Sequence, residues 1–332
     1  QVQGGGMLTC TVVGSNAFGH NVNPPGPLYT VFTVKRDEIV IEKFFGRLGN
    51  NLLQVALAIM FAEEDGYATV RLPHEPHAAV AALLNLPKQL HVERRTSSAP
   101  LACTRDTTRF WVFECLGADK GEFRRVMTRY LVPLMTNAAR TACAKERGRF
   151  NGLTIHMRSG DLMWSGHRQA KFAPCAFFNK AIRRFGYQAV RIITERKKDH
   201  PCIAEVSGRH PNVSISIQSK SVVEDFCALM SARDLVFGSM STFALTAELL
   251  SDQHTNIFMP ALCTCSNVSN VSQDVAEPPF AVNTWCYNVD GFNTIRNHKG
   301  KLHYLLDTPA ASVKEAGVCD ETQETGFDWS SL

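Results

Sequence analysis

The stretch that decides the fold is Leu153–Trp164, LTIHMRSGDLMW, in which a short apolar run leads directly into a charged turn that contains glycine. The run Leu153–Met157 predicts a buried strand, and the residues RSGD at 158–161 predict the turn that ends it. In a parallel sheet this turn would lie at the carboxyl edge, where open α/β sheets bind ligands. Because a guanidinium stays charged and can bond two phosphate oxygens at once, Arg158 is suited to an anion there.

Three residues of this stretch also have ordinary interpretations. Arg158 and Asp161 could form a surface ion pair, which would contribute only ~0–1 kcal/mol. In the functional interpretation, Asp161 locks the arginine fork or caps the turn, and it is also a candidate for the chemistry. His156, on an inward strand face, is expected to be a core histidine with satisfied hydrogen bonds rather than a catalytic group.

Strands and helices alternate on both sides of this stretch. After it, strands are predicted at 189–194, 213–217 and 234–238, and helices at 173–185, 222–232 and 243–250. Before it, a strand at 38–45, a turn GRLGNN at 46–51, a helix at 52–65 and a strand at 67–72 form a βαβ pattern. Two such blocks predict an α/β fold with two facing Rossmann-like domains built on parallel sheets.

Composition changes along the chain suggest four segments. Residues 1–36 are expected to be an extended leader, 37–150 an N-terminal α/β domain, 151–262 a C-terminal Rossmann-like domain, and 263–332 a loop-rich extension. Within the second segment, helices are expected near 77–86 and over 119–147.

Two further turns also join a strand to a helix. In GRLGNN, Arg47 and Asn50 flank Gly49 at a helix start, where backbone amides attract anions. In GSMST at 238–242, hydroxyls stand at another helix start, so this turn either binds an anion or simply caps the helix. Each turn alone favours its ordinary interpretation, whereas three of them at sheet edges favour one shared anionic ligand.

The motifs HMRSGD at 156–161, SMSTF at 239–243 and GRLGNN at 46–51 resemble, in order and spacing, those of the α-1,2-fucosyltransferase family. The resemblance to this family, and to the wider fucosyltransferase superfamily, runs from about residue 40 to 262. It implies a GT-B-like fold in which the C-terminal domain holds a GDP-sugar and the N-terminal domain holds the acceptor.

Carried onto this sequence, the resemblance implies that Arg158 binds the donor β-phosphate and that Arg47 and Asn50 face the cleft from the other domain. This sequence has Ser159 where many relatives have a second arginine, and Asn51 where a glutamine is frequent. The full set of donor-binding residues expected from the motifs is His156, Arg158, Ser239, Ser241, Thr242, Phe243, Arg47, Gly49 and Asn50.

The implied reaction is an inverting transfer of fucose from GDP-fucose to a glycan hydroxyl. The chain has no Asp-x-Asp motif, and the nearest acidic run, Glu63–Asp65, is expected to be solvated at a helix end. We therefore expect no metal cofactor, with the charge of Arg158 stabilising the departing diphosphate. The candidates for a general base are Asp161, Glu75 and His74.

Other functions remain open on this evidence. The same fold could use another nucleotide-sugar donor, or the chain could be a catalytically weak protein that binds glycans or nucleotides. A dinucleotide-dependent oxidoreductase fits worst, because neither glycine turn carries the full fingerprint.

Composition narrows the partners and the compartment. A net charge of +4 with scattered basic pairs argues against nucleic-acid binding, and no apolar run reaches the ~18–20 residues of a membrane span. Eleven cysteines and three Asn-x-Ser triplets favour the Golgi or another secretory lumen, with the cytoplasm as the alternative. Because the chain begins at Gln1 rather than methionine, a membrane anchor further upstream stays open.

Overall fold

The computed structural model places most of the chain in two compact units. One unit takes residues up to 118 together with 125–135, and the other takes 119–124 and everything from 136 onward. Both combine sheets with helices, so the predicted α/β fold class is confirmed. The residues that the structure describes are 32–35, 38–44, 46–94, 102–104, 114–116, 120–160, 163, 172–195, 200–239, 241–260, 283–289 and 298–320.

The first unit is built around a four-stranded sheet with the order β1-β2-β3-β4. The pair β2–β3 is parallel and is joined through the helix α1, as the βαβ pattern predicts, whereas β1 and β4 are antiparallel to their neighbours. The bounds of these elements are β1 Phe32–Lys35, β2 Glu38–Ile41, α1 Leu48–Asp65, β3 Thr69–Arg71, α2 Ala78–Leu83 and β4 Gln89–His91. A separate antiparallel pair consists of β5 Ala102–Thr104 and β6 Glu114–Leu116.

The helix α1 is buried along most of its length, as its almost uniformly apolar sequence predicts. It begins at Leu48 rather than at residue 52, so the last four residues of the predicted GRLGNN turn form its first turn. It ends at Gly66, whose φ of 79° lies in the left-handed region that favours glycine. Among the described residues, no helix combines the length and hydrophobicity that a bilayer crossing requires.

The acidic run at the end of α1 was expected to be solvated; Asp65 is exposed, but Glu63 is not. Glu63 is only 1% exposed, and its carboxylate forms an ion pair with Arg125 and accepts a hydrogen bond from the Tyr130 hydroxyl at 3.0 Å. Glu63 is therefore a paired interior group of the first unit and not a solvated residue.

The long helix expected over 119–147 is broken into four pieces. Pro133 lacks the amide hydrogen that a continuing helix needs, and the Thr136 side chain accepts a hydrogen bond from the Ala139 amide at 3.0 Å, which starts a new helix. The pieces are α3 Lys120–Val126, a π-helix Met127–Leu131, a 3-10 helix Val132–Leu134 and α4 Asn137–Glu146.

The second unit contains a seven-stranded sheet with the order β13-β12-β11-β10-β7-β8-β9. All neighbours are parallel except β12 and β13. The strands are β7 Leu153–His156, β8 Ala189–Ile193, β9 Ser214–Gln218, β10 Asp234–Phe237, β11 Asn256–Met259, β12 Asn283–Val289 and β13 Val313–Asp320. The chain runs outward from β7 to β9 and then returns to place β10 on the other side of β7, which is the strand order of a Rossmann fold.

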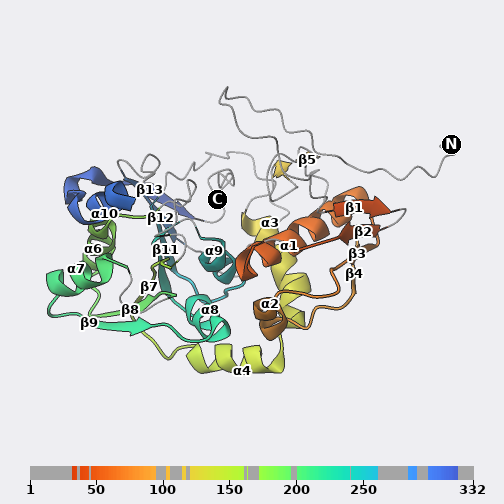
Figure 1. Ribbon diagram of the computed structural model, residues 1–332, viewed down its shortest axis with the longest axis horizontal. Helices are drawn as coiled ribbons and strands as arrows, with labels where there is room; N and C mark the ends of the chain where they lie inside the picture. Colours follow the sequence, from red (N-terminus) through yellow and green to blue (C-terminus); the bar gives the residue numbers. More distant parts are fainter. Residues whose placement is uncertain are drawn as a thin grey trace. The chain divides into compact units, whose positions relative to one another are not determined.

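Helices cover both faces of this sheet (Figure 1). One face carries α6 Cys175–Arg184, α7 Cys202–Arg209 and α10 His298–Asp307, and the other carries α4, α8 Val222–Met230 and α9 Thr242–Leu249. Because both faces are covered, the central strands β7 and β10 are buried at every position.

The last part of the chain differs from the predicted loop-rich extension. Residues 261–282 lie outside the described residues, but β12, α10 and β13 follow them and complete one side of the sheet. The strand β1 likewise falls within the predicted leader, most of which lies outside the described residues.

In the described part of the second unit, two disulfides join helices, one on each face of the sheet. Cys143–Cys227 links α4 to α8, and Cys175–Cys202 links α6 to α7. Each therefore ties together two helices that already pack against each other.

Candidate functional site

The carboxyl edge between β7 and β10 is the point where the strand order reverses. His156 and Phe237 are register partners at the ends of the two strands, and the Gly238 amide donates to the His156 carbonyl at 2.8 Å. A Cβ at Gly238 would lie 2.4 Å from that carbonyl oxygen, so only glycine permits this approach. The RSGD turn and the GSMST turn, 80 residues apart in sequence, therefore start side by side at the switch point.

Arg158 is held at this edge rather than extended into solvent. Its side chain is 13% exposed, and its Nη1 atom lies 2.7 Å from Oε1 of Glu195. Glu195 follows β8, the next strand along the sheet, so two neighbouring strand exits meet here. Sequence reasoning assigned the orienting role to Asp161, which lies outside the described residues. The sequence did contain a signal for Glu195, an acidic residue at the exit of a neighbouring predicted strand.

Gly160 and Ser159 fix the turn against the end of β8. Gly160 has a φ of 68°, and a Cβ there would lie 2.4 Å from Oε2 of Glu195. Ser159 is fully buried, and its hydroxyl bonds to that of Thr194 at 2.8 Å. Position 159 thus holds a small interior residue, where a charge would be costly to bury.

His156 is buried, but it is not the satisfied core histidine that the sequence suggested. It is 3% exposed, and its Nδ1 atom has no hydrogen-bond partner among the described residues. Its ring lies 5.8 Å from that of Phe243. Burial, together with the positive charge of Arg158 and the nearby His200, lowers the pKa of His156 from 6.5 to about 3. His156 is therefore neutral at physiological pH.

Other buried polar atoms occur in the same region. Ser239, after β10, is 2% exposed and forms a bridge with Phe172, and its hydroxyl has no partner in the described part of the chain. His200 packs against Phe172 and Phe178, and its buried Nε2 atom also has no hydrogen-bond partner in the described part of the chain. Since buried polar atoms almost always have partners, these atoms favour a polar ligand at this edge.

The GSMST turn leads into the helix α9. Ser241 precedes the helix and is 7% exposed, but its side chain forms no capping hydrogen bond, which removes the simple capping interpretation for this residue. Thr242 is the first helical residue, and Phe243 packs between His156 and Phe226, with its ring 5.4 Å from that of Phe226. The positive end of α9 therefore points to the same edge as the turn after β7.

The remaining predicted site residues belong to the first unit. Arg47 is exposed and precedes α1, Gly49 is buried in its first turn, and Asn50 packs over Gly46, whose φ is 71°. Asn51 is fully buried in the same helix and so contributes to its packing. The roles of these residues toward a ligand of the second unit stay predictions, as do those of the other first-unit candidates, the exposed His74 and Glu75.

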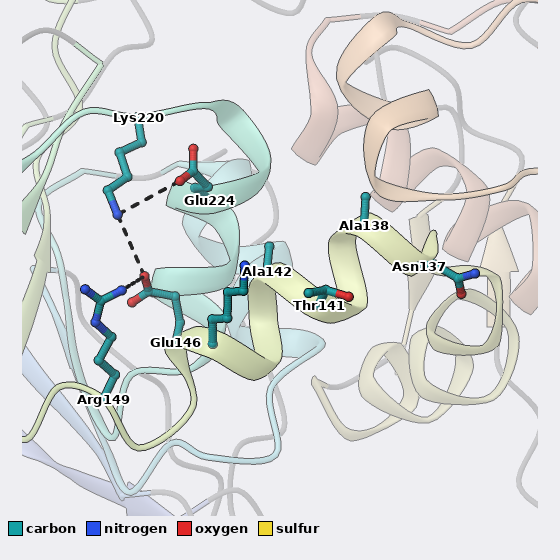
Figure 2. A pocket seen from close by; sticks show the side chains of 9 residues that line it. Asn137, Ala138, Thr141, Ala142, Glu146, Arg149, Lys220 and Glu224 are labelled. Atoms are coloured by element: carbon teal, nitrogen blue, oxygen red, sulfur yellow. Dashed lines mark ion pairs between the residues drawn. The ribbon is translucent and has the colours of Figure 1, made fainter.

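A separate open cavity of about 400 Å³ lies along α4 and the start of α8 (Figure 2). Lys220 reaches toward both Glu146 and Glu224, at 3.9 and 4.0 Å, so both carboxylates of this cavity already lie near a cation. None of the predicted site residues lines it. It is lined by Asn137, Ala138, Thr141, Ala142, Lys145, Glu146, Arg149, Lys220 and Glu224.

The second unit thus has a Rossmann strand order with an arginine, two glycine turns and a helix start at its switch point. No family model matches the chain, and no curated protein matches it. The chain is similar to crystal structures of POFUT1 with GDP-fucose in two crystal forms, each with a TM-score of 0.31, at 11% and 12% identity over 41% of this chain and 49% and 50% of the other. It is also similar to POFUT1 with GDP, with a TM-score of 0.37 at 9% identity over 64% of this chain and 95% of the other.

The chain spans about half the length of the first two POFUT1 structures that it matches. At these TM-scores the similarity does not assign the chain to a family, so its function has to be argued from its own residues.

The buried histidines predict a loss of stability in acid. The pKa values of His156 and His200 are both lowered from 6.5 to about 3, chiefly by burial. Below pH 6.5 the unfolded chain binds protons that the folded chain does not, so the free energy of unfolding falls by about 1.4 kcal/mol per pH unit for each histidine until pH 3. Urea denaturation at pH 7 and pH 5 measures this slope. In the variant His200→Asn the slope should be smaller, and an unchanged slope would contradict the assignment.

Proposed function

We propose that this protein is an inverting, metal-independent glycosyltransferase that moves fucose from GDP-fucose to a hydroxyl of a glycan. The observation that carries the proposal is the position of Arg158, which is largely buried, permanently charged and located at the switch point of a Rossmann-type sheet. The identity of the donor rests on the resemblance of the three motifs to fucosyltransferases.

In the proposed reaction the bond between the fucose anomeric carbon and the diphosphate oxygen breaks. The acceptor oxygen bonds to that carbon from the opposite face, which inverts its configuration, and its proton passes to a base. The diphosphate gains negative charge as it leaves. Arg158 and the start of α9 are already oriented at the edge, so they stabilise this charge without reorganising during the reaction.

A fixed guanidinium can take the role that a divalent cation has in metal-dependent transferases. We therefore predict that EDTA leaves the rate of transfer unchanged and that added Mg²⁺ or Mn²⁺ does not raise it. Initial rates measured with and without chelator test this directly. A loss of activity in EDTA that Mn²⁺ restores would contradict metal independence.

We assign the general base to one of Asp161, His74 and Glu75, the three candidates that the sequence offers. His156 is a poor candidate, because efficient bases have a pKa near the operating pH, and burial holds the pKa of His156 at about 3. We assign His156 a neutral role instead: its ring packs on Phe243, and its Nδ1 atom can form one hydrogen bond to a ligand.

Two measurements test the proposed function. Release of GDP from GDP-fucose, with and without glycan acceptors, reports the chemistry, and protection from thermal unfolding reports binding. The proposal expects both to favour GDP-fucose over UDP-sugars. Turnover of a different nucleotide sugar would show that the donor is not GDP-fucose. Protection by GDP without any turnover would indicate a nucleotide-binding protein that is not an enzyme.

Glu195 is expected to act as a positioning residue for Arg158. Glu195→Ala removes the carboxylate that holds Nη1 at 2.7 Å, so the guanidinium gains freedom and the donor KM should rise by about tenfold, the effect of one lost charge-assisted hydrogen bond. Glu195→Gln keeps an oxygen acceptor and should recover most of this loss. Steady-state kinetics on both variants measures the difference. Equal KM values for Glu195→Ala and the unmodified protein would refute the positioning role.

We also propose a secretory-pathway location, with the Golgi as the expected compartment. The support is the disulfides Cys143–Cys227 and Cys175–Cys202, since such bonds persist in oxidising compartments and are rare in the cytosol. Retention in the cytoplasm, with all four cysteines reduced in the native protein, would contradict it.

A further inference from the structure

The triplet Asn212-Val213-Ser214 runs from the turn after α7 into Ser214, the first residue of β9. Asn212 and Ser214 are both exposed, whereas Val213 is partly buried against the hydrophobic core of the unit. The amides of Val213 and Ser214 bond to the carbonyls of His210 and Gln188, at 3.0 and 2.9 Å. The backbone is therefore fixed while the two polar side chains that a glycosylation triplet requires stay accessible.

The turn leads directly into an edge strand. Among the described strands, β9 pairs only with β8, so its other side has no strand partner. The sequence of β9, SISIQ, contains no proline and no charged residue, and its first four positions alternate between exposed and partly buried. Natural proteins protect such edges with charges, prolines, bulges or covering groups, because an open edge pairs with other chains. The strand β9 itself carries neither a charge nor a proline.

The location is compatible with the candidate site. Asn212 precedes β9 and so lies at the amino edge of the parallel strands, while Arg158 and Ser239 follow β7 and β10 at the carboxyl edge. A large group at Asn212 would therefore leave the switch point accessible.

We propose that Asn212 is an N-glycosylation site and that its glycan covers the open edge of β9. In the reaction, a bond forms between Nδ2 of Asn212 and the first sugar carbon of an oligosaccharide. The bond from that carbon to its polyprenyl diphosphate carrier breaks, the diphosphate leaves, and the amide loses one proton. The disulfides Cys143–Cys227 and Cys175–Cys202 support the same compartment independently, since both modifications belong to the secretory pathway. This inference does not depend on the proposed transferase activity.

The test uses the full chain, expressed behind a cleavable leader in eukaryotic cells. The other two triplets are removed by Asn267→Gln and Asn270→Gln, so a glycan at residue 212 is the one detected. Treatment with an N-glycanase in heavy-oxygen water should convert residue 212 to labelled aspartate, with a mobility shift on a gel. The label should persist in Ser214→Thr, which keeps the triplet, and disappear in Ser214→Ala. An unlabelled Asn212 peptide from secreted protein would overturn the site.

The covering role has a separate readout. Asn212→Gln and Ser214→Ala should both lose monomer on a sizing column over time, whereas Ser214→Thr should behave like the unmodified chain. Folded protein that is deglycosylated after purification serves as a check that excludes a folding defect, and it should also self-associate. A glycan at Asn212 whose removal leaves the monomer peak unchanged would overturn the covering role.

Discussion

Arg158→Ala is expected to lower the rate of fucose transfer by about 10³-fold or more, the loss that follows removal of a single charge-stabilising donor or arginine in other transfer enzymes. The reason is that the departing diphosphate loses the fixed cation that its developing charge needs. The fold should survive, because the partner carboxylate of Glu195 is 30% exposed and so stays hydrated when Arg158 is removed. Initial rates with GDP-fucose measure the effect, and thermal unfolding measures the stability.

The matched control is Arg184→Ala, which removes another arginine of the second unit. Arg184 is 40% exposed and pairs with Glu315 of β13 at 3.2 Å. Its loss should leave transfer unchanged. Transfer that survives Arg158→Ala at the rate of the Arg184→Ala control would rule out the proposed role.

Glu146→Ala is expected to destabilise the second unit by about 3–5 kcal/mol, the usual cost of leaving one partner of a buried ion pair without the other. Glu146 and Arg191 are 7% and 8% exposed, and Oε2 lies 2.6 Å from Nη1. Arg191 also donates to the Ala228 carbonyl at 2.9 Å, a bond that cannot replace the lost negative charge. Urea denaturation of the variant measures the change in the free energy of unfolding.

Two comparisons separate this effect from general damage. Arg147→Ala removes an ion pair to Asp252 that is about half exposed, and it should cost only about 0–1 kcal/mol. The double variant Glu146→Leu with Arg191→Met replaces both buried charges by apolar groups of similar size and should recover most of the stability. A single Glu146→Ala cost no larger than that of Arg147→Ala would contradict the buried-pair account.

Much of the fold could be predicted because apolar runs alternate with glycine turns. The predicted strand 153–157 and helix 173–185 are found as Leu153–His156 and Cys175–Arg184, and Gly66 ends α1 as expected. These elements are determined locally, by periodic hydrophobicity and by turn residues within a few positions.

Elements that depend on distant partners were not predictable. β12 and β13 pair with each other and extend the sheet, but their sequences lie among asparagine- and glycine-rich stretches that suggest loops. The break in the helix at 127–136 is different, because Pro133 is a local signal that does favour a helix break.

In the candidate site, too, some features follow from local sequence and others depend on distant strands. The turns after β7 and β10 were identified from glycine, arginine and hydroxyl residues at strand ends. These two turns lie side by side because β10 is placed next to β7, and no local sequence pattern specifies that placement. The pairing of Arg158 with Glu195 depends on the β7–β8 register, and this long-range register was equally absent from local sequence reasoning.

The most direct test of the central claim is a crystal structure of the protein with GDP. The account predicts that a diphosphate oxygen lies about 2.7–3.2 Å from the Arg158 guanidinium, with the nucleotide at the β7–β10 edge. GDP bound elsewhere, for example in the cavity along α4 and α8, with no contact to Arg158, would contradict it.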